Sequence, residues 1–279
     1  MFSLNVIIRT KNSGNVLVRC LESIRQQSVK PNSIIVVDTE SSDATLKYAD
    51  HYKCRVLKYP LHKYPFNYSK ALNLGIDHAN SDFVLIISSH VWLPNKNTIK
   101  WMLDKLNEDT NLKAVSLARS NQLDKIDKDI KIPFGTRLNK SNFKGEGMYN
   151  YCSLIRKSDW EDYKFREDIP TCEDQDWIWH WMNTANASSF IFQFPLAGYD
   201  NPNYNIAKDI QEIYTCGTFI YPPYMSLANI FGLYKKALGF LLKKKLKKAK
   251  YHLRLGSALL KYKYFPPKDL QSDSYLVKK

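Results

Sequence analysis

The sequence predicts an α/β fold built on a mostly parallel central sheet flanked by helices. Two short apolar runs, at residues 4–8 and 33–37, have the composition of buried strands, and residues 15–27 between them have that of a helix. A strand, a helix and a second strand within 40 residues form a βαβ unit, whose strands are parallel. The same alternation continues with apolar runs at 55–57, 83–87, 114–118, 149–155 and 189–194.

Helices between these runs follow from capping residues and from apolar spacing. We expect them at 44–51, 69–77, 97–107, 157–162 and 173–182. Residues 58–69 and 120–147 contain prolines or glycines without clear periodicity, so both stretches predict loops. Together these elements predict one domain over residues 1–212 and a helical extension over residues 213–279.

The composition fits a protein of the reducing cytoplasm. The five cysteines are widely spaced and include no Cys-x-x-Cys pair, which argues against a disulfide framework or a zinc cluster. Arg9 stands where a signal peptide needs apolar residues, and no apolar run approaches 18 residues. We therefore expect no signal peptide, no transmembrane helix and a cytoplasmic location.

The extension carries the excess positive charge of the chain. Of the 41 Lys and Arg residues, twelve lie between Ile213 and Lys268, a stretch without Asp or Glu. From Leu227 to Leu253, apolar residues recur every three or four positions, which predicts one amphipathic helix that Gly256 ends. A basic amphipathic helix suits an anionic membrane surface, here through residues 226–263, at the inner face of the membrane. The alternative is that its apolar face packs on the protein body or on a second subunit of a homo-oligomer. No aromatic interleaving or known module supports nucleic-acid binding.

Polar residues end the first two predicted strands. Arg9, Thr10 and Asn12 follow the first strand, and Asp38 ends the second. Ligands of open parallel sheets bind at the carboxyl ends of the strands, so these side chains predict a nucleotide-type site. Thr10 and Asn12 can hydrogen-bond a base or a ribose, and Asp38 can accept a hydrogen bond from a base N–H or a ribose hydroxyl. The alternative for Asp38 is that it caps the turn at 41–43.

Six segments in this order resemble the family 2 glycosyltransferases, which have the GT-A fold. The resemblance covers residues 4–195 and rests on Arg9-Thr10-Lys11-Asn12, residues 20–27, Val36-Val37-Asp38, residues 66–75, Ser88-Ser89-His90-Val91 and Cys172-Glu173-Asp174-Gln175-Asp176-Trp177. It implies transfer of a sugar from a nucleoside-diphosphate sugar to an acceptor hydroxyl, with inversion at the anomeric carbon. It also implies a nucleotide-binding half at about 1–95 and an acceptor half at about 96–212.

The donor would be a UDP, GDP or dTDP sugar. The resemblance places Asp38 against the nucleoside. Lys70 could pair with the diphosphate, and Asn73 lies one helical turn away on the same face. The alternative for Lys70 is a solvated surface lysine. The expected donor-binding residues are Arg9, Thr10, Asn12, Asp38, Lys70, Asn73, Ser88 and Ser89.

Ser88-Ser89-His90 stands where the family usually has Asp-x-Asp, whose last Asp binds a divalent metal. Some members carry a Ser-x-His form, and this implies that His90 replaces the metal-binding Asp. Imidazole suits Mn²⁺ better than Mg²⁺. Members of this form often add a His beyond the last core strand, but residues 198–203 offer Asp200 and no His. The alternatives are that His90 donates a hydrogen bond to the phosphate or is structural.

Glu173 and Asp174 open a predicted helix after Pro170 and Thr171. The resemblance makes Asp174 the general base and Glu173 a neighbour that positions the acceptor or the helix. An inverting transfer needs such a carboxylate beside the acceptor hydroxyl and opposite the leaving diphosphate. The alternative is helix capping, since acids favour helix N-termini. Capping alone does not account for three acids at 173, 174 and 176.

These observations predict a bacterial-type glycosyltransferase at the cytoplasmic face of the membrane. It would extend a glycan or a lipid-linked glycan in surface polysaccharide synthesis, such as capsule or O-antigen. One rival is a GT-A-shaped binding protein without catalysis, although Asp38 and the Glu173-Asp174 pair argue against that loss. Another is a nucleotidyltransferase, which usually has a glycine-rich loop after its first strand, where this chain offers Gly14.

Overall fold

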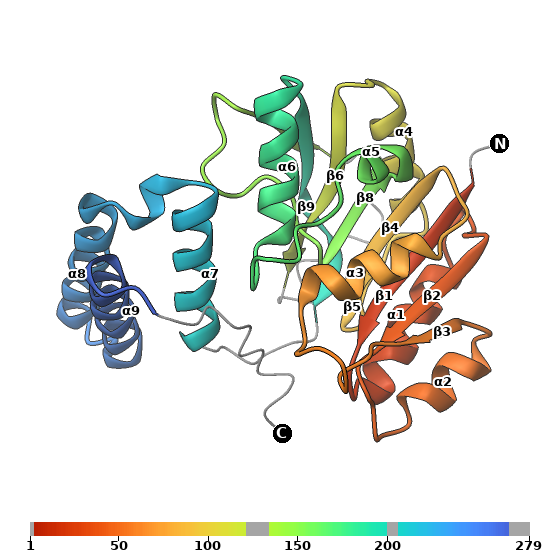
Figure 1. Ribbon diagram of the computed structural model, residues 1–279, viewed down its shortest axis with the longest axis horizontal. Helices are drawn as coiled ribbons and strands as arrows, with labels where there is room; N and C mark the ends of the chain where they lie inside the picture. The colour runs from red at the N-terminus through yellow and green to blue at the C-terminus, as the bar shows by residue number, and fades with distance from the viewer. Residues whose placement is uncertain (1–2, 121–133, 200–205, 268–279) are drawn as a thin grey trace.

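The computed structural model describes residues 3–120, 134–199 and 206–267 (Figure 1). Its strands are β1 (Leu4–Thr10), β2 (Ser33–Asp38), β3 (Arg55–Lys58), β4 (Phe83–Ser88), β5 (Val91–Trp92), β6 (Leu112–Ser120), β7 (Gly135–Asn139), β8 (Cys152–Arg156) and β9 (Ser188–Tyr199). The helices are α1 (Gly14–Arg25), α2 (Thr45–His51), α3 (Tyr68–Asp77), α4 (Thr98–Asn107), α5 (Lys157–Asp162), α6 (Glu173–Thr184), α7 (Ile206–Phe219), α8 (Leu227–Leu242) and α9 (Leu246–Tyr264), with a 3-10 turn at Pro222–Met225.

The central sheet is parallel in its first half and mixed in its second. Its strand order is β3-β2-β1-β4-β8-β6-β9-β5, and β7 pairs with β9. Strands β3, β2, β1 and β4 are parallel, as the βαβ pattern predicts. Strand β8 runs antiparallel to both β4 and β6, while β6 and β9 are parallel. As a result, the start of β8 lies beside the carboxyl end of β4.

Helices cover both faces of the sheet, as the α/β prediction requires (Figure 1). Alternate residues of β1 point to opposite faces, so Val6 and Ile8 belong to one hydrophobic cluster and Ile7 to the other. Helices α1 and α4 contribute to the first cluster, and α3, α5 and α6 to the second. These two buried layers fix the sheet edge at which the polar residues after β1, β2 and β4 lie.

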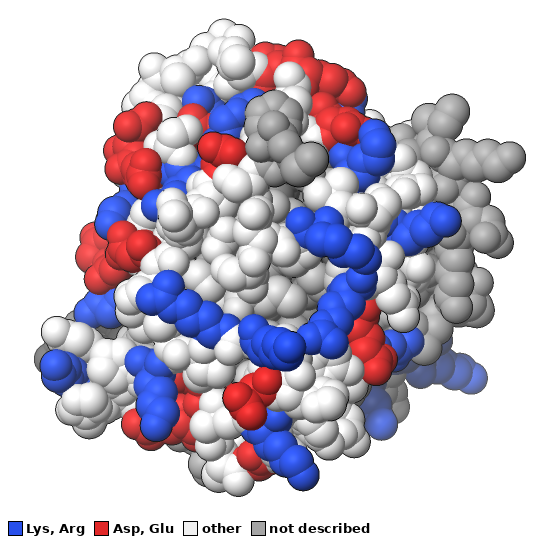
Figure 2. All heavy atoms as spheres, turned by 90° about the vertical axis from the view of Figure 1, so that its right-hand side faces the viewer, with Lys and Arg blue, Asp and Glu red and all other residues white. Residues whose placement is uncertain are grey.

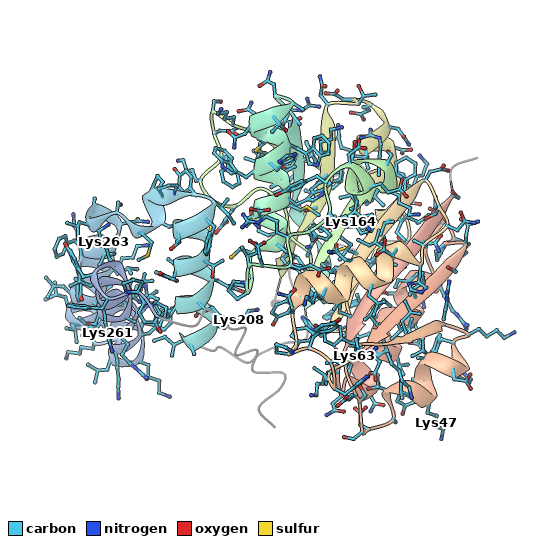
Figure 3. All side chains as sticks on the ribbon, viewed as in Figure 1. Lys47, Lys63, Lys164, Lys208, Lys261 and Lys263 are labelled. Atoms are coloured by element: carbon cyan, nitrogen blue, oxygen red, sulfur yellow. The ribbon has the colours of Figure 1, made fainter. Side chains whose placement is uncertain are left out.

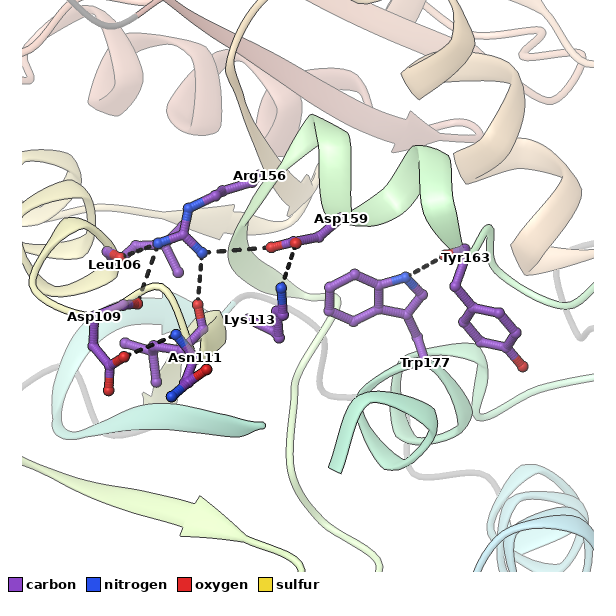
Figure 4. A network of polar contacts seen from close by, with 9 residues as sticks. Leu106, Asp109, Asn111, Lys113, Arg156, Asp159, Tyr163 and Trp177 are labelled. Atoms are coloured by element: carbon purple, nitrogen blue, oxygen red, sulfur yellow. Dashed lines mark hydrogen bonds and ion pairs between the residues drawn. The ribbon is translucent and has the colours of Figure 1, made fainter. Parts of the chain in front are cut away.

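A partly buried polar network ties the end of α4 to the strands beside it (Figure 4). Arg156 donates to the carbonyl oxygens of Leu112 (2.7 Å) and Asp109 (3.2 Å), and also to that of Leu106. Asp159 accepts a charge-assisted hydrogen bond from Lys113 at 2.6 Å and lies 3.4 Å from Arg156. The guanidinium donates to three carbonyl oxygens, and the buried carboxylate of Asp159 is compensated by two partly exposed cations.

Two expectations from the sequence are wrong. Part of the stretch 120–147, expected to be a loop, is strand β7, and residues 121–133 of that stretch lie outside the described residues. The single helix expected from Leu227 to Gly256 is a hairpin of two helices, α8 and α9, joined at Lys243–Lys245. Lys244 adopts a left-handed φ of 56° at this turn. Gly256 lies inside α9 rather than ending it.

Small residues explain why the extension folds back. Ala237 of α8 and Ala249 of α9 are fully buried, and Gly256 lies against the ring of Tyr234, which a Cβ there would meet at 3.2 Å. Such residues let two helices approach closely. A continuous helix would leave this side of both segments in water, so folding back buries apolar surface that a straight helix exposes.

Candidate functional site

The carboxyl ends of β1, β2 and β4 bring four predicted donor-binding residues to one edge of the sheet. Thr10 pairs in register with Asp38 on β2, and Arg9 pairs with Ser88 on β4. Thr10, Asp38 and Ser88 are all buried. The backbone N–H of Thr39 donates to the carbonyl oxygen of Thr10 at 3.0 Å, which extends the pairing past the strand ends.

A chain of hydroxyl groups joins this edge to the start of α1. The hydroxyl of Thr10 donates to Ser13 Oγ at 2.7 Å, and Ser13 Oγ lies 2.7 Å from Ser89 Oγ. Thr10 and Ser89 were expected at the site from the sequence, whereas Ser13 was not. Its signal was weak, because a serine before a helix is an ordinary capping residue.

Asp38 holds the turn that follows β2. Its two carboxylate oxygens accept hydrogen bonds from the backbone N–H of Ser41 (3.0 Å) and from the Ser41 hydroxyl (2.5 Å). Ser41 Oγ in turn accepts from the backbone N–H of Asn12, and the Asn12 side chain accepts from the backbone N–H of Ser42, both at 2.8 Å. The turn-capping alternative for Asp38 is therefore present, and each carboxylate oxygen keeps a lone pair for a ligand.

Two cations lie over aromatic rings at the start of α3. The guanidinium of Arg9 is 4.7 Å from the ring centre of Tyr68, and the ammonium of Lys70 is 4.3 Å from that of Tyr64. Both side chains are partly exposed. Cation–π contacts of this kind hold the side chains in place without cancelling their charge, so both stay available to an anion.

Asn73 has a different environment from the one expected. Its amide nitrogen donates to Phe165 O (2.8 Å) and Glu167 Oε1 (2.9 Å), and its oxygen accepts from Trp160 Nε1 at 3.1 Å. These buried contacts bind α3 to the segment that follows α5. The Asn73 amide is thus engaged by other residues of the protein. Contact between Asn73 and the donor stays a prediction, and these hydrogen bonds do not support it.

The two acids at the start of α6 are held by Asn150, which precedes β8. The backbone N–H of Asn150 donates to Asp174 Oδ2 at 3.1 Å, and its side-chain amide donates to Glu173 Oε1 at 3.2 Å. The next residue, Tyr151, accepts a hydrogen bond from the backbone N–H of Ser88 at 2.9 Å. The antiparallel course of β8 thus places the acids near the donor edge. The sequence offered no signal for Asn150.

The environment of Asp174 shifts its titration towards neutrality. Burial, the charge of Glu173 and, to a smaller extent, the charge of Glu212 on α7 together raise the pKa of Asp174 to about 7. The backbone N–H groups of Asn150 and Gln175 oppose this shift because they stabilise the carboxylate. A carboxylate that titrates near pH 7 is suited to accept a proton from a substrate hydroxyl.

Asn67 links the donor edge to the loop before these acids. Its side-chain oxygen caps α3 by accepting from the backbone N–H of Lys70 at 2.9 Å. Its amide nitrogen donates to the carbonyl oxygens of Glu167 and Ile169, each at 3.1 Å. The segment leading to Glu173 is therefore fixed to the helix that carries Lys70.

His90 lies between β4 and β5 and is partly exposed. Within the described parts of the chain, no group of three or more His, Cys, Asp or Glu side chains could hold a metal ion. Asp200 lies outside the described residues. One imidazole next to two serines does not fit the oxygen-rich set that a hard divalent cation prefers, so we derive no step through a metal.

Comparison with known proteins decides the family. The family model of glycosyl transferase family 2 matches residues 5–163. The chain belongs to glycosyl transferase family 2. It is therefore a glycosyltransferase, and the fold, with its sheet covered by helices, is that of the GT-A enzymes. The family predicted from the sequence motifs is confirmed.

The chain is similar at low sequence identity to several glycosyltransferases. The O-antigen chain rhamnosyltransferase RfbN of Salmonella typhimurium is 26% identical over 98 residues, which make up 35% of this chain and 31% of the relative. The mannosyltransferase PcManGT of Pyrobaculum calidifontis, solved with GDP-Man and Mn²⁺, has a TM-score of 0.67 at 13% identity over 96% of this chain and 88% of its own. Staphylococcus aureus TarS 1-349, solved with UDP-GlcNAc, has a TM-score of 0.57 at 16% identity over 93% and 81%.

Proposed function

We propose that the protein is an inverting glycosyltransferase that moves a sugar from a nucleoside-diphosphate sugar to a hydroxyl of a glycan or lipid-linked glycan. The observation that carries the proposal is Asp174, with its pKa near 7, held by Asn150 next to the strand end at Ser88. A proton acceptor beside a sheet edge suited to a nucleotide is the arrangement that this reaction needs.

In the proposed reaction, the acceptor hydroxyl oxygen attacks the anomeric carbon from the face opposite the diphosphate. The new bond joins that carbon to the acceptor oxygen, and the bond from the carbon to the diphosphate oxygen breaks. The hydroxyl proton passes to Asp174, and the nucleoside diphosphate leaves with the bonding electron pair. The charge of Glu173 raises the pKa of Asp174, which makes Asp174 a stronger base. Asp174 can therefore take the proton from the acceptor hydroxyl as that oxygen attacks.

The nucleoside of the donor is assigned to Thr10, Asn12 and Asp38. The network of hydroxyls and amides around them is already formed, so few side chains need to be ordered on binding. Arg9 and Lys70 are assigned to the diphosphate, whose charge grows as the bond breaks. These are the groups that compensate that charge in the proposed mechanism, and His90 is assigned to a phosphate hydrogen bond.

The proposed acceptor belongs to bacterial surface polysaccharide. The similarity to an O-antigen rhamnosyltransferase supports this class, although it covers about a third of both chains. A lipid-linked acceptor would be met at the inner face of the membrane, where the basic extension would hold the enzyme. The proposed donor is a sugar linked to UDP, GDP or dTDP. Two of the similar structures contain donors of this kind, GDP-Man and UDP-GlcNAc.

Calorimetric titration with UDP, GDP and dTDP, each with and without Mn²⁺, tests the donor site. We expect one of the three to bind without Mn²⁺, and Asp38→Asn to weaken that binding about tenfold or more because a buried hydrogen-bond acceptor is lost. Asp50→Asn, an exposed position on α2, is the matched control. If none of the three nucleotides binds, the assignment of this edge to a donor is wrong.

The non-catalytic alternative is separated from the transferase by a second measurement. A binding protein would bind the nucleotide without turning over a nucleotide sugar. The measurement is release of the nucleoside diphosphate from the donor in the presence of acceptor glycan. Transfer is supported if Asp174→Asn loses this release but keeps its affinity for the nucleotide. Turnover that is equal in wild type and Asp174→Asn would remove Asp174 as the base. If Mn²⁺ is required for binding and His90→Ala abolishes that requirement, a metal must be added to the mechanism.

A further inference from the structure

Exposed apolar side chains gather on the C-terminal hairpin. Among the described residues, ten of the twelve exposed large hydrophobic side chains lie between Phe219 and Phe265. On α8, Leu227, Phe231, Leu238 and Leu242 follow one another at intervals of four, seven and four residues, so they share one face of the helix. Leu242 is 79% exposed at the end of α8, and Leu246 is 68% exposed at the start of α9.

A neighbouring face of the hairpin already packs on the rest of the protein. Ile230, Leu255 and Leu259 are buried in a small cluster with Tyr214 of α7 and Met225. Helices α8 and α9 lie on the outer side of α7, away from the sheet (Figure 1). Phe231, Leu238 and Leu242 lie roughly a quarter turn around α8 from the buried Ile230, and within the described chain these three side chains are exposed.

Lysines border this apolar face, and acids are absent from it. Residues 214–267 contain no Asp or Glu, and Lys243, Lys244 and Lys245, all exposed, form the turn between the helices. Lys261 and Lys263 lie on the same hairpin, at the end of the molecule far from Lys47 and Lys63 (Figure 3). The face of the molecule on the side opposite the hairpin carries acidic and basic residues interspersed (Figure 2).

We propose that the tip and outer face of the α8–α9 hairpin dock on an anionic phospholipid bilayer. Leucines and a phenylalanine at the surface enter the boundary between headgroups and acyl chains, and the lysines around them meet the lipid phosphates. Long lysine side chains can keep their ammonium groups at the headgroups while their stems lie along the apolar layer. The link to a lipid-linked acceptor rests on the proposed function, whereas attachment to the bilayer does not.

A second copy of the chain fits this face less well. A symmetric dimer would bring the same surface of two copies together, and with it the lysines at 243–245 of both. No acid within residues 214–267 is available to compensate them. Like charges facing each other at an interface oppose association, so the same arrangement that favours anionic lipid disfavours self-pairing.

Co-sedimentation of the full chain with vesicles tests the proposal. Vesicles of phosphatidylglycerol and phosphatidylcholine are compared with pure phosphatidylcholine, at low and high salt. We expect binding to the anionic vesicles only, weakened by salt. The triple variant K243Q/K244Q/K245Q should lose about a hundredfold in partitioning, since each lysine near such a surface contributes about fivefold. The variant L238Q/L242Q/L246Q should also lose tenfold or more, because it removes the inserted apolar groups.

The control K47Q/K53Q/K96Q removes the same charge from exposed positions outside the hairpin and should keep vesicle binding. Circular dichroism of each variant checks that the fold is retained. Failure to bind anionic vesicles, or equal binding by the leucine variant and wild type, would overturn the proposal. The proposal would also be overturned if the wild-type protein forms a dimer in sedimentation equilibrium, the leucine variant does not, and neither binds the vesicles. Nucleotide titration of the same samples reports separately on the proposed function.

Discussion

Replacing Asp174 with asparagine should make the protein more stable at alkaline pH and much less active. The pKa of this carboxyl is raised from 3.8 to about 7, chiefly by burial and by the charge of Glu173. Its protonated form is therefore favoured in the folded state, and the fold loses stability as the pH rises from about 4 to about 7. Asparagine stays neutral throughout, so the variant escapes this loss.

The size of the effect follows from the shift. About three pKa units correspond to about 4 kcal/mol over the whole titration, of which roughly 2.5 kcal/mol falls between pH 5 and pH 8. Because Asp174 is partly exposed, water screens part of this penalty, and we expect a difference of about 1 to 2 kcal/mol. The hydrogen bonds from Asn150 and Gln175 stabilise the ionised form of Asp174, and their effect is already contained in the pKa of about 7. Comparing the two pH values cancels only those effects of the substitution that do not depend on pH.

Urea unfolding followed by tryptophan fluorescence at pH 5 and pH 8 measures this difference. Asp50→Asn, at an exposed position on α2, is the control and should show no such gain. Transfer by Asp174→Asn should fall by about 10² to 10⁴, the usual contribution of a general base. A variant that gains nothing over wild type between pH 5 and pH 8, or a control that gains as much, would refute the reasoning from burial.

Three further predictions concern other parts of the chain. The transfer rate should rise about tenfold per pH unit below pH 7 and level off above it, because Asp174 must be ionised to accept a proton. Glu173→Gln should move the midpoint of this pH profile to lower pH. A flat profile from pH 5.5 to 8 would contradict the assignment of Asp174 as the base. Gly145→Ala should destabilise the fold by about 1 to 3 kcal/mol in urea unfolding, because φ at Gly145 is +83° and an added Cβ would lie 2.3 Å from the ring of Tyr224. At Gly239 an added Cβ would meet nothing within 4 Å, so Gly239→Ala should stabilise α8 by about 0.5 to 1 kcal/mol. Asn67→Asp keeps the cap of α3 but loses the two amide hydrogen bonds to the loop before the acids, so it should lower the rate of transfer more than nucleotide affinity, and equal effects on both would argue against a positioning role.

Local patterns made the donor edge predictable. Strands β1 and β2 are apolar runs that stop at polar residues, and parallel pairing then brings Thr10 and Asp38 together whatever the rest of the chain does. The family resemblance added Ser89 and the acid pair. In the structure Thr10, Asp38 and Ser89 lie at one edge of the sheet, and the acid pair at the start of α6 lies near that edge through Asn150.

Long-range contacts could not be predicted in this way. The position of Asn150 depends on the antiparallel insertion of β8 between β4 and β6, which no local spacing reveals. Asn73 shares a helix face with Lys70, yet its amide is used by Phe165, 92 residues away. The apolar period from Leu227 to Leu253 is continuous in sequence, but the chain turns back at Lys244 because buried small residues let α8 and α9 pack.

The hairpin shares a small hydrophobic cluster with α7 and the 3-10 turn, and this cluster is separate from the two layers that cover the sheet. A segment with so few buried side chains can open while the sheet stays folded, since cooperative units of a protein differ in their local stability. We therefore expect the amides of α8 and α9 to exchange with solvent faster than those of the strands that hold Thr10, Asp38 and Ser88.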